Sequence, residues 1–257
     1  MIEKTWILGP CSMEGESLYN EIADTLYPFM KGKDWYYKAS FDKANRTSVK
    51  GGRSPGLEEG CEMFKNIKQK YPDIKLTTDV HDVHQVEKLA EAGIDCIQIP
   101  AFLCRQTDLI VECAKHFNIV NVKKMQFLGP DNVIKGVDKI KNTNPDCQAW
   151  LTDRGTNFGY DKLIVDFTIV DEIKKYYDKF IFDVTHATQR SREIYVKQAD
   201  RDLGERYLLI SDIMGYDGVF AETHPRPEEA VSDADSQIYL NKIKSVIDRA
   251  DRIAKVL

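Results

Sequence analysis

Short apolar segments rich in Ile, Val, Phe, Tyr and Thr alternate eight times with longer amphipathic segments along this chain. We predict β-strands at residues 5–8, 35–39, 75–80, 96–100, 119–123, 148–152, 179–184 and 218–222. Alternation of this kind predicts a parallel sheet whose strands are joined by helices. Eight such units in 257 residues leave no room for a second domain. The sequence therefore predicts a single-domain (β/α)8 barrel over residues 1–257.

The segments between the strands repeat apolar residues at helical spacing. We predict helices at residues 57–71, 83–92, 108–117, 162–177 and 237–256. Residues 40–55 and 185–200 are long for connecting loops, which is typical of segments with a function. The charged run at residues 200–206 is predicted to be a mobile segment.

Composition excludes several classes of protein. The 36 basic and 41 acidic residues give a net charge of −5, which argues against a nucleic-acid-binding protein. No apolar run is long enough for a membrane-spanning helix, and the N-terminus lacks the layout of a signal peptide. The six cysteines are scattered without a paired C-x-x-C, as expected of reduced thiols in a cytoplasmic protein. Neither G-x-G-x-x-G after a strand nor a Walker A motif is present, so nucleotide binding has little support.

Polar side chains follow the ends of the predicted strands, where the active site of such a barrel lies. One group consists of the cations Lys38, Lys43, Lys124 and Arg154. Clustered cations repel one another unless an anion joins them, so this group predicts binding of a phosphate or carboxylate. The alternative is that two or three of them are solvated charges at the rim.

A second group consists of Cys11, His186 and Glu222, with Asp79, Asp233 or Asp235 to complete it. A thiolate, an imidazole and carboxylates together suit a divalent transition metal such as zinc, iron or manganese. The three residues follow or end the first, seventh and eighth strands, which are neighbours in a closed barrel. The alternative is that Cys11 is a small buried apolar residue. Core packing is expected for Cys61, Cys96, Cys104 and Cys113.

The segment KASFDKANRTS at residues 38–48 resembles the 3-deoxy-D-manno-octulosonate 8-phosphate synthase family. Further motifs follow in the order of that family: GPCSME (9–14), SPGLEEG (54–60), TDVH (78–81), IQIPAFLCRQTDL (97–109), NVKKMQF (121–127), TDRGTNFGYDKLIVDF (152–167), FDVTHATQ (182–189) and ETHPRPEEAVSDADSQ (222–237). The resemblance covers nearly the whole chain and is weakest at residues 190–206.

The resemblance implies an enzyme that condenses phosphoenolpyruvate with arabinose 5-phosphate and releases inorganic phosphate. It also implies a (β/α)8 barrel that is usually a homotetramer. The implied catalytic residues are Lys38, Lys43, Asp79, Lys124, Arg154 and His186. The implied substrate-binding residues are Ser40, Asn45, Arg46, Thr47, Gln98 and Arg105, the last reaching in from a neighbouring subunit. No nucleic-acid or membrane partner is expected.

Members of the family carry either Cys or Asn at the position of Cys11, and those with Cys depend on a metal. The resemblance therefore implies that Cys11, His186, Glu222 and Asp233 bind a divalent transition metal. The loop at residues 190–206 has a single glycine where the family has a Gly-rich lid. This departure leaves open another aldose phosphate, such as erythrose 4-phosphate, or a barrel that binds these ligands without catalysis. A Schiff-base aldolase has less support, because Arg154 follows the sixth strand where such enzymes commonly carry a lysine.

Overall fold

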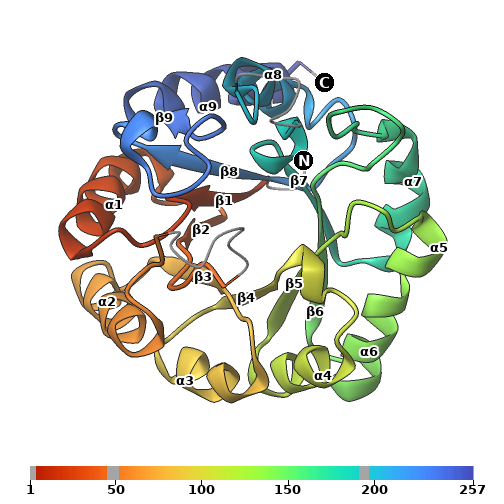
Figure 1. The fold of residues 1–257 in the computed structure, drawn as a ribbon, viewed down its shortest axis with the longest axis horizontal. Helices are drawn as coiled ribbons and strands as arrows, with labels where there is room; N and C mark the ends of the chain where they lie inside the picture. The colour runs from red at the N-terminus through yellow and green to blue at the C-terminus, as the bar shows by residue number, and fades with distance from the viewer. Residues whose placement is uncertain (1–3, 45–51, 191–196, 257) are drawn as a thin grey trace.

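Eight parallel strands pair in the order of the sequence in the computed structural model, which describes residues 4–44, 52–190 and 197–256. They are β1 (Thr5–Gly9), β2 (Trp35–Lys38), β3 (Lys75–Asp79), β4 (Cys96–Ile99), β5 (Ile119–Lys123), β6 (Gln148–Asp153), β7 (Lys179–Asp183) and β8 (Gly218–His224). Strand β8 also pairs with β1, so the sheet closes into a barrel (Figure 1). The predicted (β/α)8 fold is confirmed, and every predicted strand is present.

Helices surround the barrel on its outer face (Figure 1). They are α1 (Glu16–Met30), α2 (Leu57–Lys70), α3 (Val86–Glu91), α4 (Thr107–His116), α5 (Pro130–Val133), α6 (Lys135–Thr143), α7 (Val170–Ile173), α8 (Arg201–Ile210) and α9 (Leu240–Ala254). No helix among the described residues is long and apolar enough to cross a membrane. The helices predicted at residues 57–71, 83–92, 108–117 and 237–256 are confirmed, the second of them with a 3₁₀ turn at Val83–Gln85 as its first turn.

Two layers of apolar side chains stabilise the barrel. One fills its interior and consists of Ile7, Tyr36, Cys96, Trp150, Ile181 and Phe220. The larger layer lies between the sheet and the helices and includes Cys61, Cys104 and Cys113, so the four cysteines predicted to pack in the core do so. Burial of these side chains is the main favourable contribution to folding.

The pairing of β1 with β8 determines which residues meet at the barrel mouth. Its register places Gly9 beside Glu222. Cys11 therefore lies next to the end of β8, although the two positions are far apart in the sequence. A two-residue strand, β9 (Ile238–Tyr239), then pairs with β8 and returns the loop 225–237 to the mouth. Within that loop Asp233 has a φ of 53°, a left-handed conformation that Asp tolerates better than most residues.

The helix predicted at residues 162–177 is wrong for its first part. Residues 162–166 are not helical, and Thr156 pairs with Ile164 in an isolated antiparallel bridge. The side chain of Asp166 accepts a hydrogen bond from the Thr168 backbone N–H, so the helical region begins only after Asp166. The segment then consists of the short 3₁₀ and α-helical turns Phe167–Ile169, Val170–Ile173 and Lys174–Tyr176.

The prediction that residues 200–206 are mobile is also wrong, because they form the start of helix α8. The Asp200 side chain accepts a hydrogen bond from the Leu203 backbone N–H and caps this helix. Gly204 lies against the segment that follows β7, and a Cβ atom there would come within 2.8 Å of the Val184 carbonyl oxygen. The helix thus packs directly on the chain that carries His186.

We expect Gly204→Ala to lower the melting temperature. Alanine favours an isolated helix over glycine by about 1 kcal/mol, but the contact with Val184 forces α8 away from the barrel. Gly129→Ala is the control, because no atom lies within 4 Å of its added Cβ. Thermal unfolding followed by circular dichroism measures both variants. A Gly204→Ala variant that melts at or above the temperature of the wild type contradicts this packing.

Candidate active site

A cavity of about 1120 Å³ opens at the carboxyl ends of the barrel strands. Its lining includes Lys38, Lys43, Asp79, Gln98, Lys123, Arg154, His186, Gln189, Glu222 and Asp233. These residues come from or follow seven different strands. The cavity therefore occupies the place where (β/α)8 enzymes carry their active sites.

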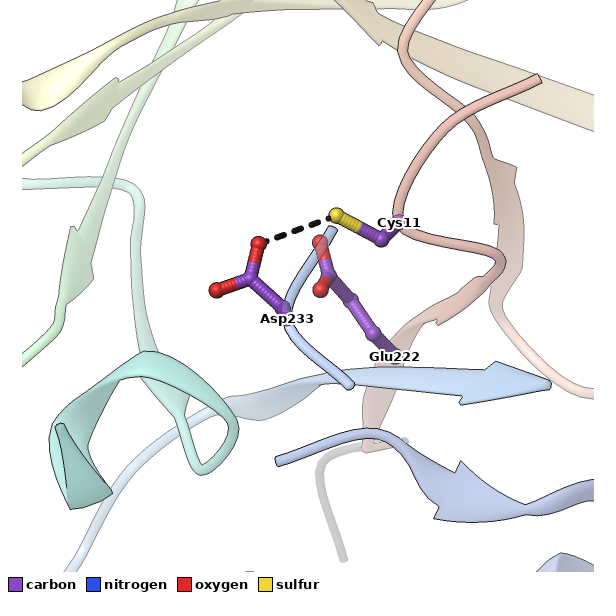
Figure 2. Close-up of side chains that lie close together, drawn as sticks. All are labelled: Cys11, Glu222 and Asp233. Atoms are coloured by element: carbon purple, nitrogen blue, oxygen red, sulfur yellow. Dashed lines mark hydrogen bonds between the residues drawn. The ribbon is translucent and has the colours of Figure 1, made fainter. Parts of the chain in front are cut away.

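The four predicted metal ligands lie close together at this cavity, and Figure 2 shows three of them, Cys11, Glu222 and Asp233. The Cys11 Sγ lies 3.2 Å from Asp233 Oδ2, and the ligand atoms of Cys11, Glu222 and Asp233 all lie within 4.8 Å of one another. His186 Nε2 lies 3.9 Å from both Glu222 Oε2 and Asp233 Oδ2. Asp235, one of the alternatives for completing the set, instead accepts a hydrogen bond from the Gln198 backbone N–H.

The chemistry of this cluster fits a divalent transition metal. Glu222 Oε2 is buried and has no hydrogen-bond partner among the described residues. Burial raises the pKa of the Cys11 thiol well above its usual range, and the Glu222 carboxylate raises it further. A divalent cation offsets both effects, because it binds a thiolate directly and supplies positive charge to the carboxylates. The set of one sulfur, one imidazole nitrogen and two carboxylates is also a combination that such metals accept.

The buried side chain of Lys38 forms hydrogen bonds with two residues of the cluster, Glu222 and Cys11. Its ammonium donates hydrogen bonds to Glu222 Oε1 at 2.7 Å and to the Cys11 carbonyl oxygen at 2.6 Å. Both side chains of this ion pair are almost completely buried, at 2% and 0% exposure. Lys38 therefore orients the Glu222 carboxylate and binds the Cys11 backbone, both at candidate metal ligands, and its predicted contact with a substrate anion stays a prediction.

A polar row crosses the ends of β2, β3 and β4. The Ser40 hydroxyl donates to Asp79 Oδ2 at 2.6 Å, and the Gln98 side-chain amide donates to Asp79 Oδ1. The Lys43 ammonium lies 3.4 Å from the Ser40 hydroxyl. Burial acts to raise the pKa of Asp79, but the positive charges of Lys38 and Lys43 outweigh it and hold that pKa well below its usual range. The row thus presents a charged carboxylate with polar neighbours to the cavity.

Two cations at the cavity lack a carboxylate partner among the described residues. Arg154 is 9% exposed, and its Nη2 donates to Gln189 Oε1 at 2.5 Å, whereas its Nε is buried without a partner. Lys43 forms no ion pair within the described ranges either. A buried cation without a direct ion pair is costly, so Arg154, together with the partly exposed Lys43, is expected to bind the anionic groups of a ligand. The Gln189 side-chain amide also donates to Asp233 Oδ1 at 3.4 Å and so connects Arg154 to the cluster of Cys11, Glu222 and Asp233.

The sequence analysis missed Lys123 and Asp183. Lys123 points into the barrel, lines the cavity and donates to Asp183 Oδ2 at 2.5 Å. Asp183 also lies 2.8 Å from His186 Nδ1. Burial acts to raise the pKa of Asp183, but His186 and Lys123 hold it well below its usual range. A signal for Asp183 was in the sequence, because it ends a strand three residues before His186. The face of β5 that Lys123 shares with Asn121 became evident only from the structure.

Lys124 lies beneath the loop that follows β6 rather than in the cavity. Its ammonium is 1% exposed, donates to the Gly155 carbonyl and the Thr156 hydroxyl, and lies 3.2 Å from Asp153 Oδ1. Arg105 is exposed and, together with Lys124, lines a second cavity of about 410 Å³, which shares Lys123 with the larger one. The predicted substrate contacts Asn45, Arg46 and Thr47 lie outside the described residues.

Comparison with known protein families matches residues 3–254 to the DAHP synthetase I family. The chain belongs to this family. Similar proteins named 2-dehydro-3-deoxyphosphooctonate aldolase occur in Wolinella succinogenes, with 40% identity over 97% of this chain and 99% of the relative, and in Fusobacterium nucleatum, with 38% identity over 98% and 90%. The same name belongs to a Helicobacter hepaticus protein that is 40% identical over 94% of this chain and 93% of its own length.

The similar proteins named 2-dehydro-3-deoxyphosphooctonate aldolase, together with the family match, confirm the resemblance that the motifs predict and confirm that the chain is an enzyme. The matches extend over nearly the whole chain, so all eight barrel units are included. The individual roles of the site residues stay predictions.

We expect Lys38→Met to destabilise the metal-free protein by about 3 to 5 kcal/mol, because it leaves the buried Glu222 carboxylate without its counter-charge. Adding Glu222→Gln to this variant recovers part of the loss, since both charges are then absent. Urea unfolding in the presence of a chelator measures the effect. Lys65→Met is the control, because its ion pair with Glu62 is exposed. Equal midpoints for Lys38→Met and Lys65→Met would show that the buried pair does not stabilise the fold.

Proposed function

We propose that the chain condenses phosphoenolpyruvate with arabinose 5-phosphate and water, giving 3-deoxy-D-manno-octulosonate 8-phosphate and inorganic phosphate. The names of the similar proteins and the motifs at residues 9–14 and 38–48 support this reaction. The main structural support is the buried Arg154 guanidinium, which has no acidic partner among the described residues and lies at the same cavity as the Cys–His–Glu–Asp cluster.

Phosphoenolpyruvate has the charges that this site requires. Its phosphate and carboxylate are anions close together on a small molecule, and Arg154 and Lys43 are the cavity cations without an ion pair in the described part of the chain. An arginine also binds a phosphate or carboxylate through two parallel hydrogen bonds. The polar row of Ser40, Asp79 and Gln98 supplies acceptors and donors for the hydroxyls of an aldose phosphate.

The reaction forms a bond between the methylene carbon of phosphoenolpyruvate and the aldehyde carbon of the sugar, whose oxygen takes up a proton. The oxygen of water bonds to the former enol carbon. The carbon–oxygen bond to phosphate in the resulting hemiketal then breaks, and inorganic phosphate leaves. Arg154 and Lys43 hold the anionic groups in place throughout and stabilise the charge that develops on the departing phosphate.

Cys11, His186, Glu222 and Asp233 would hold a divalent transition metal such as zinc, iron or manganese. When bound, such a metal supplies a Lewis acid that polarises an oxygen and orients the groups around it. Lys38 keeps the Glu222 carboxylate charged and directed into the site, and Gln189 connects Asp233 to the anion site through hydrogen bonds.

The resemblance to the family also supports a homotetramer, in which Arg105 of one copy completes the sugar-phosphate site of another. Arg105 is exposed and does not line the cavity of its own chain, as this arrangement requires. The six cysteines are free thiols, which supports a reducing compartment, the cytoplasm.

Release of inorganic phosphate from phosphoenolpyruvate tests the reaction. We expect release with arabinose 5-phosphate, which EDTA abolishes and which added zinc or manganese restores. Parallel assays contain erythrose 4-phosphate or ribose 5-phosphate as the acceptor. Release with one of these sugars alone would replace the proposed acceptor but keep the chemistry. Saturable binding of phosphoenolpyruvate without release from any sugar would favour a barrel that binds without catalysis.

We expect Arg154→Met to raise the KM for phosphoenolpyruvate at least about tenfold and to lower kcat, because the guanidinium binds the anion in the ground state and in the transition state. Steady-state kinetics with varied phosphoenolpyruvate measures both constants. Arg226→Met is the matched control, since Arg226 is exposed and pairs with Glu229 outside the cavity. Kinetic constants of Arg154→Met equal to those of the control contradict the anion site.

A further inference from the structure

Asp183, the last residue of β7, forms hydrogen bonds with three residues around it. Its carboxylate is fully buried and accepts four hydrogen bonds. Oδ1 accepts from the backbone N–H groups of Thr185 and His186 at 3.1 and 2.9 Å. Oδ2 accepts from the Lys123 ammonium at 2.5 Å and from the His186 ring at 2.8 Å. Asp183 therefore determines both the backbone and the ring orientation of one candidate metal ligand.

The contact with Asp183 determines which nitrogen of His186 faces the other ligands. A carboxylate only accepts hydrogen bonds, so the ring donates from Nδ1. In a neutral ring the lone pair then lies on Nε2. This nitrogen is the one that lies 3.9 Å from Glu222 Oε2 and from Asp233 Oδ2. The hydrogen bond to Asp183 thus presents the ring to the cluster in the tautomer that binds a metal.

Lys123 completes this arrangement. Its ammonium balances the charge of Asp183 and lies 3.6 Å from the centre of the Phe220 ring in the barrel interior. It also lies 3.5 Å from His186 Nδ1. Lys123 and Asp183 are both buried, so their ion pair is shielded from water. The pair lies beside Nδ1 of the imidazole.

We propose that Asp183, supported by Lys123, is a positioning residue that fixes the tautomer and orientation of His186 for binding a divalent transition metal. This inference rests on the proposed metal site and goes beyond it, because it assigns a role to two residues that do not themselves contact the metal. The hydrogen bond from a histidine ring distinguishes Asp183, at the end of β7, from the corresponding aspartate at the end of β6. At the end of β6, Asp153 likewise accepts from a backbone N–H two residues on and pairs with the buried Lys124, but its remaining partner is the Tyr216 hydroxyl.

Cobalt binding to the metal-free protein tests this role without reference to activity. Binding of Co²⁺ to Cys11 is followed by the thiolate-to-cobalt charge-transfer absorption, and its affinity is measured by competition with a chelator. We expect Asp183→Asn to weaken cobalt binding about 10- to 100-fold. We expect the matched Asp153→Asn variant to bind cobalt as the wild type does, although it also loses a buried carboxylate that faces a lysine.

The single variant Asp183→Asn leaves the buried Lys123 charge unpaired and could fail to fold for that reason. The double variant Lys123→Met/Asp183→Asn avoids this, because it removes both buried charges together. We expect it to fold in the absence of metal, as measured by thermal unfolding, and still to bind cobalt weakly. Wild-type cobalt affinity in Asp183→Asn or in the double variant overturns the positioning role. Equal weakening in Asp183→Asn and Asp153→Asn overturns it too, because the loss is then a general effect of removing a buried carboxylate. Absence of the charge-transfer absorption in the wild-type protein instead overturns the metal site itself.

Discussion

The parallel pairing between β1 and β8 is the constraint on which the active site depends. It places Gly9 beside Glu222, and so brings Cys11 to a carboxylate that lies more than 200 residues away in the chain. The short pairing of β9 with β8 then returns Asp233 to the same point. In an open sheet the first and last strands would lie at opposite edges, and this cluster would not form.

Charge balance explains how so many ionisable groups are buried together at the barrel mouth. Lys38 pairs with Glu222, and Lys123 pairs with Asp183, so these charges offset one another within the chain. The buried Glu222 Oε2 and the Arg154 Nε are polar atoms without partners in the described ranges. One lies in the acidic cluster and the other belongs to a cation, which supports the proposal that the site binds a cation and an anion as ligands.

The strands and their order were predictable from the sequence, because buried parallel strands are apolar. The closure of a barrel makes its first and last strands neighbours, so the proximity of Cys11, His186 and Glu222 was predictable too. Only the family resemblance favoured Asp233 over Asp79 and Asp235, and metal binding itself stays a prediction. The sequence did not show which of the adjacent residues Lys123 and Lys124 faces the barrel interior. That depends on the strand face at the last residue of β5, and the structure places Lys123 in the cavity and Lys124 beneath a loop. Helix α8 was not predicted, because the run at residues 200–206 is mostly charged. The Asp200 side chain caps this helix, and the close packing of Gly204 on Val184 is a tertiary contact that the sequence does not show.

The central claim is that a cation and phosphoenolpyruvate bind side by side at the barrel mouth. The cation would bind at the cluster of Cys11, His186, Glu222 and Asp233, and phosphoenolpyruvate at Arg154 and Lys43. Anomalous X-ray diffraction from crystals of the cobalt-loaded protein grown with phosphoenolpyruvate tests it most directly. We predict one cobalt ion bonded to Cys11 Sγ, His186 Nε2, Glu222 and Asp233, with the phosphate or carboxylate of phosphoenolpyruvate on Arg154. Cobalt bound at other residues, or phosphoenolpyruvate bound outside this cavity, would contradict the claim.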